Sequence, residues 1–177
     1  ATVMTHDVSI PIHELRFFLH VDADLCAPRS QSGVFAFIGN DSEGTKTPIP
    51  IAWISKKQSI AADSVGLSEV IAAHRGIKEA LALTLPLSAI LDPAFAQLHG
   101  FADYGTVLRV DVRGMSANLH LYSRAIGLRI SLIRDLIAKE VIVAQHIPSA
   151  KNKANMFTKV LPRLHFQTER QMLSILP

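Results

Sequence analysis

The feature of the sequence that most constrains its fold is a succession of three strand-like segments placed before one long helical segment. Apolar and other residues alternate from Leu15 to Val21, and the strand that they predict ends at Asp22. Two further apolar runs follow, Val34 to Ile38 and Pro48 to Ile54, with a polar stretch at 40–47 between them. Together the three segments predict an antiparallel meander with a long second hairpin.

A helix is predicted directly after this meander. Apolar residues recur at helical spacing from Leu67 to Leu81, with Asp63 or Ser64 as the candidate N-cap. Pro86 is expected to end the helix, because proline lacks the backbone N–H that the next turn needs. The following segment, 85–105, mixes prolines, glycines and apolar residues and is left unplaced.

Two more strands and further helices are predicted in the second half of the chain. Branched residues indicate a fourth strand at Thr106 to Val110, which delivers Asp111 at its end, and a fifth at Glu140 to Ile147. Periodic apolar residues at 117–139 predict one kinked helix or two consecutive helices between these strands. Two closing helices are predicted at 152–157 and 166–175.

This order of elements predicts an α/β fold. We expect a five-stranded mixed sheet, flanked by helices, whose first three strands are antiparallel and whose later strands are parallel. A chain of 177 residues has the length of one ordinary domain, so one domain is expected over 1–177, with 1–14 as a leader segment.

The composition is typical of an intracellular globular protein. With 49% apolar and 19% charged residues, the chain can bury a sizeable core. No apolar run approaches the roughly 20 residues that span a bilayer, so no membrane partner is expected. Cys26 is the only cysteine, which suits a reducing compartment, and we expect a cytoplasmic or nuclear location. The start at Ala1, without an initiator Met or a signal peptide, suggests a piece of a longer protein.

Three acidic residues occupy positions from which such a sheet can bring them together. Asp22 ends the first predicted strand, Glu69 lies in the first turns of the long helix, and Asp111 ends the fourth predicted strand. Because ligands of open α/β sheets bind near strand ends, these carboxylates are candidate site residues.

Five blocks of the sequence carry a family resemblance. They are Val21-Asp22-Ala23-Asp24 with Arg29-Ser30-Gln31-Ser32-Gly33-Val34, Ile51-Ala52-Trp53-Ile54-Ser55-Lys56-Lys57-Gln58, Ser68-Glu69-Val70-Ile71-Ala72 with Lys78-Glu79-Ala80-Leu81, Leu108-Arg109-Val110-Asp111 with Ser116-Ala117, and His146-Ile147-Pro148 through Phe157-Thr158-Lys159-Val160-Leu161. In this order, from about Asp22 to Leu176, they resemble the RNase H domain that ends the polyprotein of copia-type LTR retrotransposons. The resemblance implies an RNase H-like fold and a reverse transcriptase domain in the same polyprotein as a partner.

The activity that the resemblance implies is hydrolysis of the RNA strand of an RNA:DNA hybrid. Carboxylates of the family bind two Mg²⁺ (or Mn²⁺) ions roughly 4 Å apart, which activate the attacking water and neutralise the charge on the leaving oxygen. By this resemblance Asp22 bridges both ions, Glu69 and Asp111 hold one of them, and Asn155 stands where the family has its fourth ligand.

Three departures from the family pattern bear on activity. The usual Asn-x-Ala-Asp reads Asn152-Lys153-Ala154-Asn155, so Asn155 keeps an oxygen ligand but loses a charge, which would weaken the second metal. Arg113 follows Asp111 and would either compete with metal for the carboxylate or hold a phosphate. The histidine and acidic neighbour expected at 123–130 are missing.

Basic residues indicate where a hybrid would lie. The net charge of +3 permits an anionic partner. A surface that tracks phosphates is expected to include Lys56, Lys57, Arg113, Lys151 and Lys153, and the alternative for each residue is an ordinary solvated face. His146 is expected to be structural, and Trp53 is expected to pack in the core.

Two functional classes therefore stay open. The first is a magnesium-dependent ribonuclease that uses Asp22, Glu69, Asp111 and Asn155. The second is a degenerate or repurposed RNase H-like domain, without catalysis, that binds nucleic acid or a protein. Three retained acids favour the enzyme, to which we lean, whereas the lost fourth acid, the lost histidine and Arg113 favour the second class.

Overall fold

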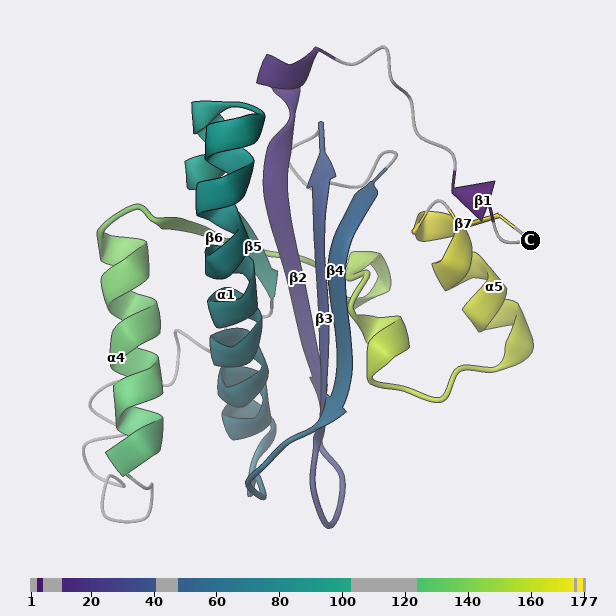
Figure 1. Ribbon diagram of the computed structural model, residues 1–177. Helices are drawn as coiled ribbons and strands as arrows, with labels where there is room; N and C mark the ends of the chain where they lie inside the picture. The colour runs from purple at the N-terminus through teal and green to yellow at the C-terminus, as the bar shows by residue number, and fades with distance from the viewer. Residues whose placement is uncertain (1–2, 5–10, 41–47, 103–123, 174, 177) are drawn as a thin grey trace.

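The core of the protein is a five-stranded sheet in the order β4-β3-β2-β5-β6 (Figure 1). The computed structural model describes residues 3–4, 11–40, 48–102, 124–173 and 175–176. The strands are β2 Arg16–Asp24, β3 Gln31–Gly39, β4 Ile49–Lys57, β5 Leu98–Ala102 and β6 Ile142–His146. Strands β2, β3 and β4 pair antiparallel, whereas β2 with β5 and β5 with β6 pair parallel. The predicted fold class, including the mixed sheet, is confirmed.

The fourth strand of the sheet lies outside the segment that the sequence predicts. The predicted strand at Thr106 to Val110 falls outside the described residues, and the strand between β2 and β6 is β5, from the segment left unplaced. Leu98 is fully buried, but His99 and Gly100 follow it and interrupt the run of branched apolar residues by which a strand is recognised.

The long helix α1 (Val65–Ile90) begins where the sequence predicts but ends later. Ser64 is the N-cap, and its hydroxyl accepts a hydrogen bond from the Leu67 N–H at 3.3 Å. Pro86 does not end the helix. The proline removes one hydrogen bond from the last turns, whereas the next residue, Leu87, is partly buried and packs against the hydrophobic core, which favours continuation of the helix.

Helices cover both faces of the sheet (Figure 1). Helices α1 and α4 (Arg124–Ala138) lie on one face, and α5 (Arg163–Met172) lies on the other side. Alternate residues of β2 point to the two faces. The cluster beneath α1 and α4 contains the β2 side chains Phe17, Leu19 and Val21. The opposite cluster contains Phe18, Phe35, Phe37, Ile147 and Leu173.

Trp53 does not pack in the core, and the prediction for it is wrong. It is 61% exposed. Its partner across the β3–β4 ladder, Phe35, is buried. The difference arises because β4 is an edge strand of the five-stranded sheet, with a neighbour on one side only.

Short elements complete the described part of the chain. These are η1 Ile12–Glu14, η2 Pro93–Ala96, η3 Ser149–Lys151, η4 Asn155–Phe157, β1 Val3–Met4 and β7 Ile175–Leu176. The closing helix predicted at 152–157 is a 3₁₀ turn over its second half only. Helix α5 begins before the predicted 166 and ends before Ile175, which instead pairs with Met4 from the expected leader segment. In the described part of the chain, no helix has both the length and the apolar character needed to cross a bilayer.

Candidate active site

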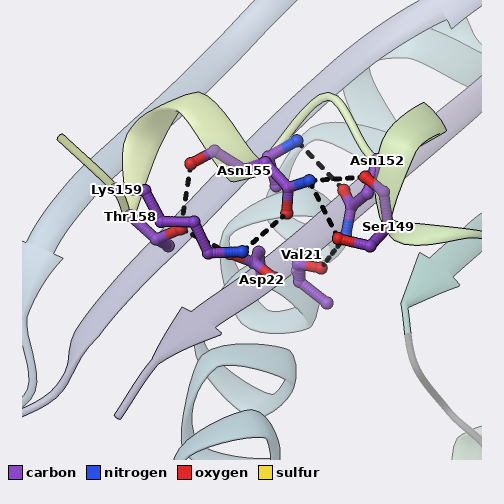
Figure 2. A network of polar contacts seen from close by, with 8 residues as sticks. Val21, Asp22, Ser149, Asn152, Asn155, Thr158 and Lys159 are labelled. Carbon is purple, nitrogen blue, oxygen red and sulfur yellow. Dashed lines mark hydrogen bonds and ion pairs between the residues drawn. The ribbon is translucent and has the colours of Figure 1, made fainter. Parts of the chain in front are cut away.

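Asp22 lies near the C-terminal end of β2, the central strand, and is 8% exposed. The Thr158 hydroxyl donates a hydrogen bond to its Oδ2 atom, and the Lys159 ammonium lies 3.6 Å from the same oxygen (Figure 2). Burial raises the pKa of Asp22 above its ordinary value of 3.8, while the Thr158 hydrogen bond and the Lys159 charge act in the opposite direction. The carboxylate is thus largely desolvated but held by two donors.

Glu69 lies beside Asp22 in a common pocket. The Ser64 cap fixes where α1 begins, which sets Glu69 in the first turns of the helix, and the residue is 8% exposed. Both acids line a pocket of about 460 Å³ together with Asn152 and Lys159. The structure therefore brings together two of the predicted acids. The third, Asp111, lies outside the described residues, as does Arg113.

The segment at 149–159 is tied to β2 by side chains. Asn152 is buried, its Nδ2 donates to the Val21 carbonyl at 2.8 Å, and its Oδ1 accepts from the Ala154 N–H at 3.0 Å. The Lys153 N–H donates to His20 Nδ1 at 3.1 Å. These bonds hold the segment against the strand end on which Asp22 lies.

Gly33 lets the same segment approach β3 closely. A Cβ atom at this position would lie 2.6 Å from the Ala154 carbonyl oxygen and 2.7 Å from Thr158 Cγ2. Because Gly33 is paired with Asp22 in the sheet, the absence of a side chain there places Thr158 within reach of the Asp22 carboxylate.

Asn155 is 7% exposed and is oriented by Ser149. Its Nδ2 donates to the Ser149 carbonyl at 2.5 Å and to the Ser149 hydroxyl at 3.2 Å. Its Oδ1 accepts from the Lys159 ammonium at 3.5 Å (Figure 2). The amide oxygen consequently points to the same cation as Asp22.

Lys159 therefore lies between two oxygens that the family resemblance assigns to metal. Its ammonium contacts both Asp22 and Asn155. An oxygen-preferring divalent ion suits the donors present, which are two carboxylates and an amide oxygen. An ion bound to both Asp22 and Asn155 would have to displace the ammonium. In the described ranges, no three His, Cys, Asp or Glu side chains gather as a metal-ion cluster.

The predicted phosphate-tracking lysines fall into two groups. Lys56, Lys57 and Lys151 are exposed. Lys57 lies at the end of β4, paired with Gln31, which is in turn paired with Asp24, and its ammonium donates to the Arg29 carbonyl at 3.2 Å. The prediction for Lys153 is wrong, because this residue is 1% exposed and its ammonium lies 5.3 Å from the centre of the Phe37 ring.

Sequence reasoning missed three residues of the site, of which His146 and Lys159 line the pocket and Thr158 contacts Asp22. His146, expected to be structural, is exposed and lines the pocket at the end of β6. Thr158 and Lys159 belong to the Phe-Thr-Lys block, whose presence was the available signal. The block indicated the segment but not the contacts that Thr158 and Lys159 make with Asp22.

Comparison with known proteins agrees with this architecture. No protein-family model matches the chain. The N-terminal RNase H domain of Rv2228c from Mycobacterium tuberculosis, solved as a fusion with maltose-binding protein, is 12% identical, with a TM-score of 0.50 over 89% of this chain and 97% of that chain. LC11-RNase H1, isolated from compost by a metagenomic approach, is 13% identical, with a TM-score of 0.47 over 82% of this chain and 92% of that chain. Its complex with an RNA/DNA hybrid is 16% identical, with a TM-score of 0.45 over 81% and 93%. The mixed sheet, its flanking helices and the similarity to the mycobacterial domain establish that this chain has the RNase H-like fold.

Proposed function

We propose that this chain is the RNase H-type endonuclease domain of a copia-type retroelement, which hydrolyses the RNA strand of RNA:DNA hybrids. The observation that carries the proposal is the pocket at the end of β2, where the buried Asp22 and Glu69 carboxylates face one space. A buried carboxylate whose pKa is raised by burial, as that of Asp22 is, is typical of catalytic sites when it lies in a pocket at a strand end. The five sequence blocks and the RNase H-like fold support the same activity. A reverse transcriptase domain of the same polyprotein is the proposed partner.

Asp22 and Glu69, with Asp111 and the Asn155 amide oxygen, would hold Mg²⁺ or Mn²⁺, two ions in the active state. When bound, such ions activate a water molecule and neutralise charge on the phosphodiester. Thr158 orients the Asp22 carboxylate through its hydroxyl. Lys159 is 41% exposed on a long, flexible side chain, so its ammonium can turn toward solvent as an ion enters.

The chain's exposed lysines would position the hybrid. Lys56 and Lys57 lie at the C-terminal end of β4, and Asp24 lies at the C-terminal end of β2, two strands away, which corresponds to about 10 Å. Lys151 lies on η3, next to Ser149 of the pocket. Contacts from these lysines to phosphates require no base recognition, which suits a substrate recognised by its backbone and shape.

The test is cleavage of an end-labelled RNA:DNA hybrid in Mg²⁺ and in Mn²⁺. Asp22→Asn and Asp111→Asn are expected to abolish cleavage. Asp103→Asn is assayed together with these variants, because Asp103 directly follows Ala102, the last residue of β5, in the sequence. Asp63→Asn, an exposed acid before α1, is the matched control and should retain activity.

A second candidate function is a repurposed RNase H-like domain without catalysis. Lys159 favours it, since its ammonium balances Asp22 without any metal. The variants Asn155→Asp and Lys159→Met separate the two candidates. Faster cleavage of the hybrid by either variant supports the nuclease. If neither the parent nor either variant cleaves the hybrid in Mg²⁺ or in Mn²⁺, the domain without catalysis is the function.

A further inference from the structure

A second pocket lies apart from the one that Asp22 and Glu69 line. Its volume is about 210 Å³, it is formed by the start of β3, the segment after β4, α1 and α4, and it shares no lining residue with the Asp22 pocket. Arg75 lies six residues beyond Glu69 on α1, or about 9 Å along the helix axis. The volume is below the roughly 300 Å³ at which sites for whole small molecules begin, so the pocket suits one small chemical group.

The lining of this pocket is strongly cationic. Arg75 and Lys78 from α1 and Arg129 from α4 face it, against one carboxylate, Glu79. The pKa of His74, which also lines the pocket, is lowered from its ordinary value of 6.5 by burial and then by the charges of Arg129 and Lys78. The charges of Arg129 and Lys78, which oppose protonation of His74, favour an anion in the same place.

Two guanidinium nitrogens in this pocket are buried without an acceptor in the described part of the chain. They are Arg75 Nε and Arg129 Nη1. Arginine stays charged, so neither group can escape the cost of its unmade hydrogen bond by losing a proton. Two such donors from different helices, lining one pocket, match the several oxygens of a tetrahedral oxyanion.

Neutral groups add to this arrangement. The Ser32 hydroxyl accepts a hydrogen bond from Gln58 Nε2 at 3.0 Å, which leaves its own hydrogen to donate. Gln58 Nε2 also donates to the Ser68 carbonyl at 2.9 Å, so the amide is fixed, and its Oε1 is buried without a partner among the described residues. A hydroxyl group of the ligand or a water molecule would donate the hydrogen bond that Gln58 Oε1 needs.

We propose that the pocket between Arg75 of α1 and Arg129 of α4 is a binding site for a phosphate group. The group can belong to a polynucleotide backbone or to a small phosphorylated compound, and the chemistry that recognises it is the same. The site goes beyond the proposed nuclease activity and does not depend on it, because none of its residues lines the Asp22 pocket.

The first test is calorimetric titration of the full chain with inorganic phosphate at constant ionic strength. Saturable binding is expected, with at least a tenfold loss of affinity in Arg75→Gln/Arg129→Gln and no loss in Arg163→Gln, a matched substitution of an exposed arginine on α5. Circular dichroism checks the fold of each variant. If the Gln pair does not fold, Arg75→Lys/Arg129→Lys keeps the charge but lacks the forked donors, and weaker phosphate binding is expected from it. Equal affinity in all variants, or no saturable binding, overturns the proposal.

The second test identifies the source of the phosphate. Anisotropy of a labelled RNA:DNA hybrid is measured in EDTA, where cleavage cannot occur. Hybrid binding that phosphate competes away, and that falls more in the Gln pair than in Arg163→Gln, assigns the site to a backbone phosphate. Phosphate binding with unchanged hybrid affinity assigns it to a small phosphorylated compound. Failure of hybrid cleavage would affect neither titration.

Discussion

At the scale of single residues, Gln58 links separate blocks of the sequence in space. It is 2% exposed and joins Ser32 from one block to the Ser68 carbonyl beside Glu69 in another. An amide is well suited to this position because it offers two donors on one nitrogen. The sequence blocks therefore meet at a buried polar junction.

Asn155 gives the sharpest prediction at this scale. Asn155→Asp introduces the acid that the family it resembles has at this position, but it replaces the amide that donates to the Ser149 carbonyl with a carboxylate that repels it. We expect the variant to lose about 1–3 kcal/mol of unfolding free energy without divalent ions, the cost of an unpaired buried acceptor. Urea denaturation in EDTA and in Mn²⁺ measures the effect. Mn²⁺ should recover more stability in the variant than in the parent, and equal recovery would count against Asn155 as a ligand.

Some residues of the candidate site could be predicted from the sequence, and others could not. The positions of Asp22, near the end of β2, and of Glu69, in the first turns of α1, were predictable because the local pattern marks where each element ends or begins. The contacts of Lys159 were not, since they depend on how a late segment folds back onto β2. Lys153 was misassigned for the same reason, because burial against Phe37 is a tertiary property that a charged residue in a polar sequence does not reveal.

At the scale of elements, strands β2 and β3 were predictable because alternation and branched residues specify a strand locally. The 149–159 segment was not, because long-range side-chain bonds rather than helical periodicity hold it, as Asn152 does at Val21. Helix α1 continues past Pro86 because tertiary packing, here of Leu87, can override the local preference of proline for a helix end.

Gly33 tests how closely η4 must approach the sheet. In Gly33→Ala the new methyl would meet the Ala154 carbonyl, a backbone atom that cannot rotate away. We expect a loss of about 1–3 kcal/mol of unfolding free energy, as for other overpacked sites, and a weaker contact between Thr158 and Asp22. Gly127→Ala, inside α4, is the control and should not destabilise, because alanine favours a helix. Thermal denaturation compares the two, and equal melting temperatures would refute the close approach.

At the scale of the whole molecule, stability should depend on pH through His99 of β5. Burial, followed by the Arg16 charge, lowers the pKa of His99 from the ordinary 6.5. Below pH 6.5, His99 therefore binds a proton in the unfolded chain more readily than in the folded protein. The contribution of neutral His99 to the free energy of unfolding is present above pH 6.5 and is lost as the pH falls toward the pKa of the folded protein.

The check on this linkage is urea denaturation at several pH values between about 7.5 and 5.5, a range that brackets the ordinary histidine pKa. His99→Gln should flatten the fall in stability, whereas His13→Gln, a change at an exposed histidine outside the sheet, should not. Parallel pH profiles for the parent and both variants would show that His99 is not the responsible group.

The position of Lys159 has a consequence for any cation that enters the pocket. Because a tethered ammonium already supplies one positive charge at Asp22, binding there becomes an exchange of one cation for another. A monovalent ion would replace one charge with an equal one, so only an ion of higher valence gains electrostatic energy from the exchange. The lysine thus acts as a built-in competitor that sets a minimum valence for the site.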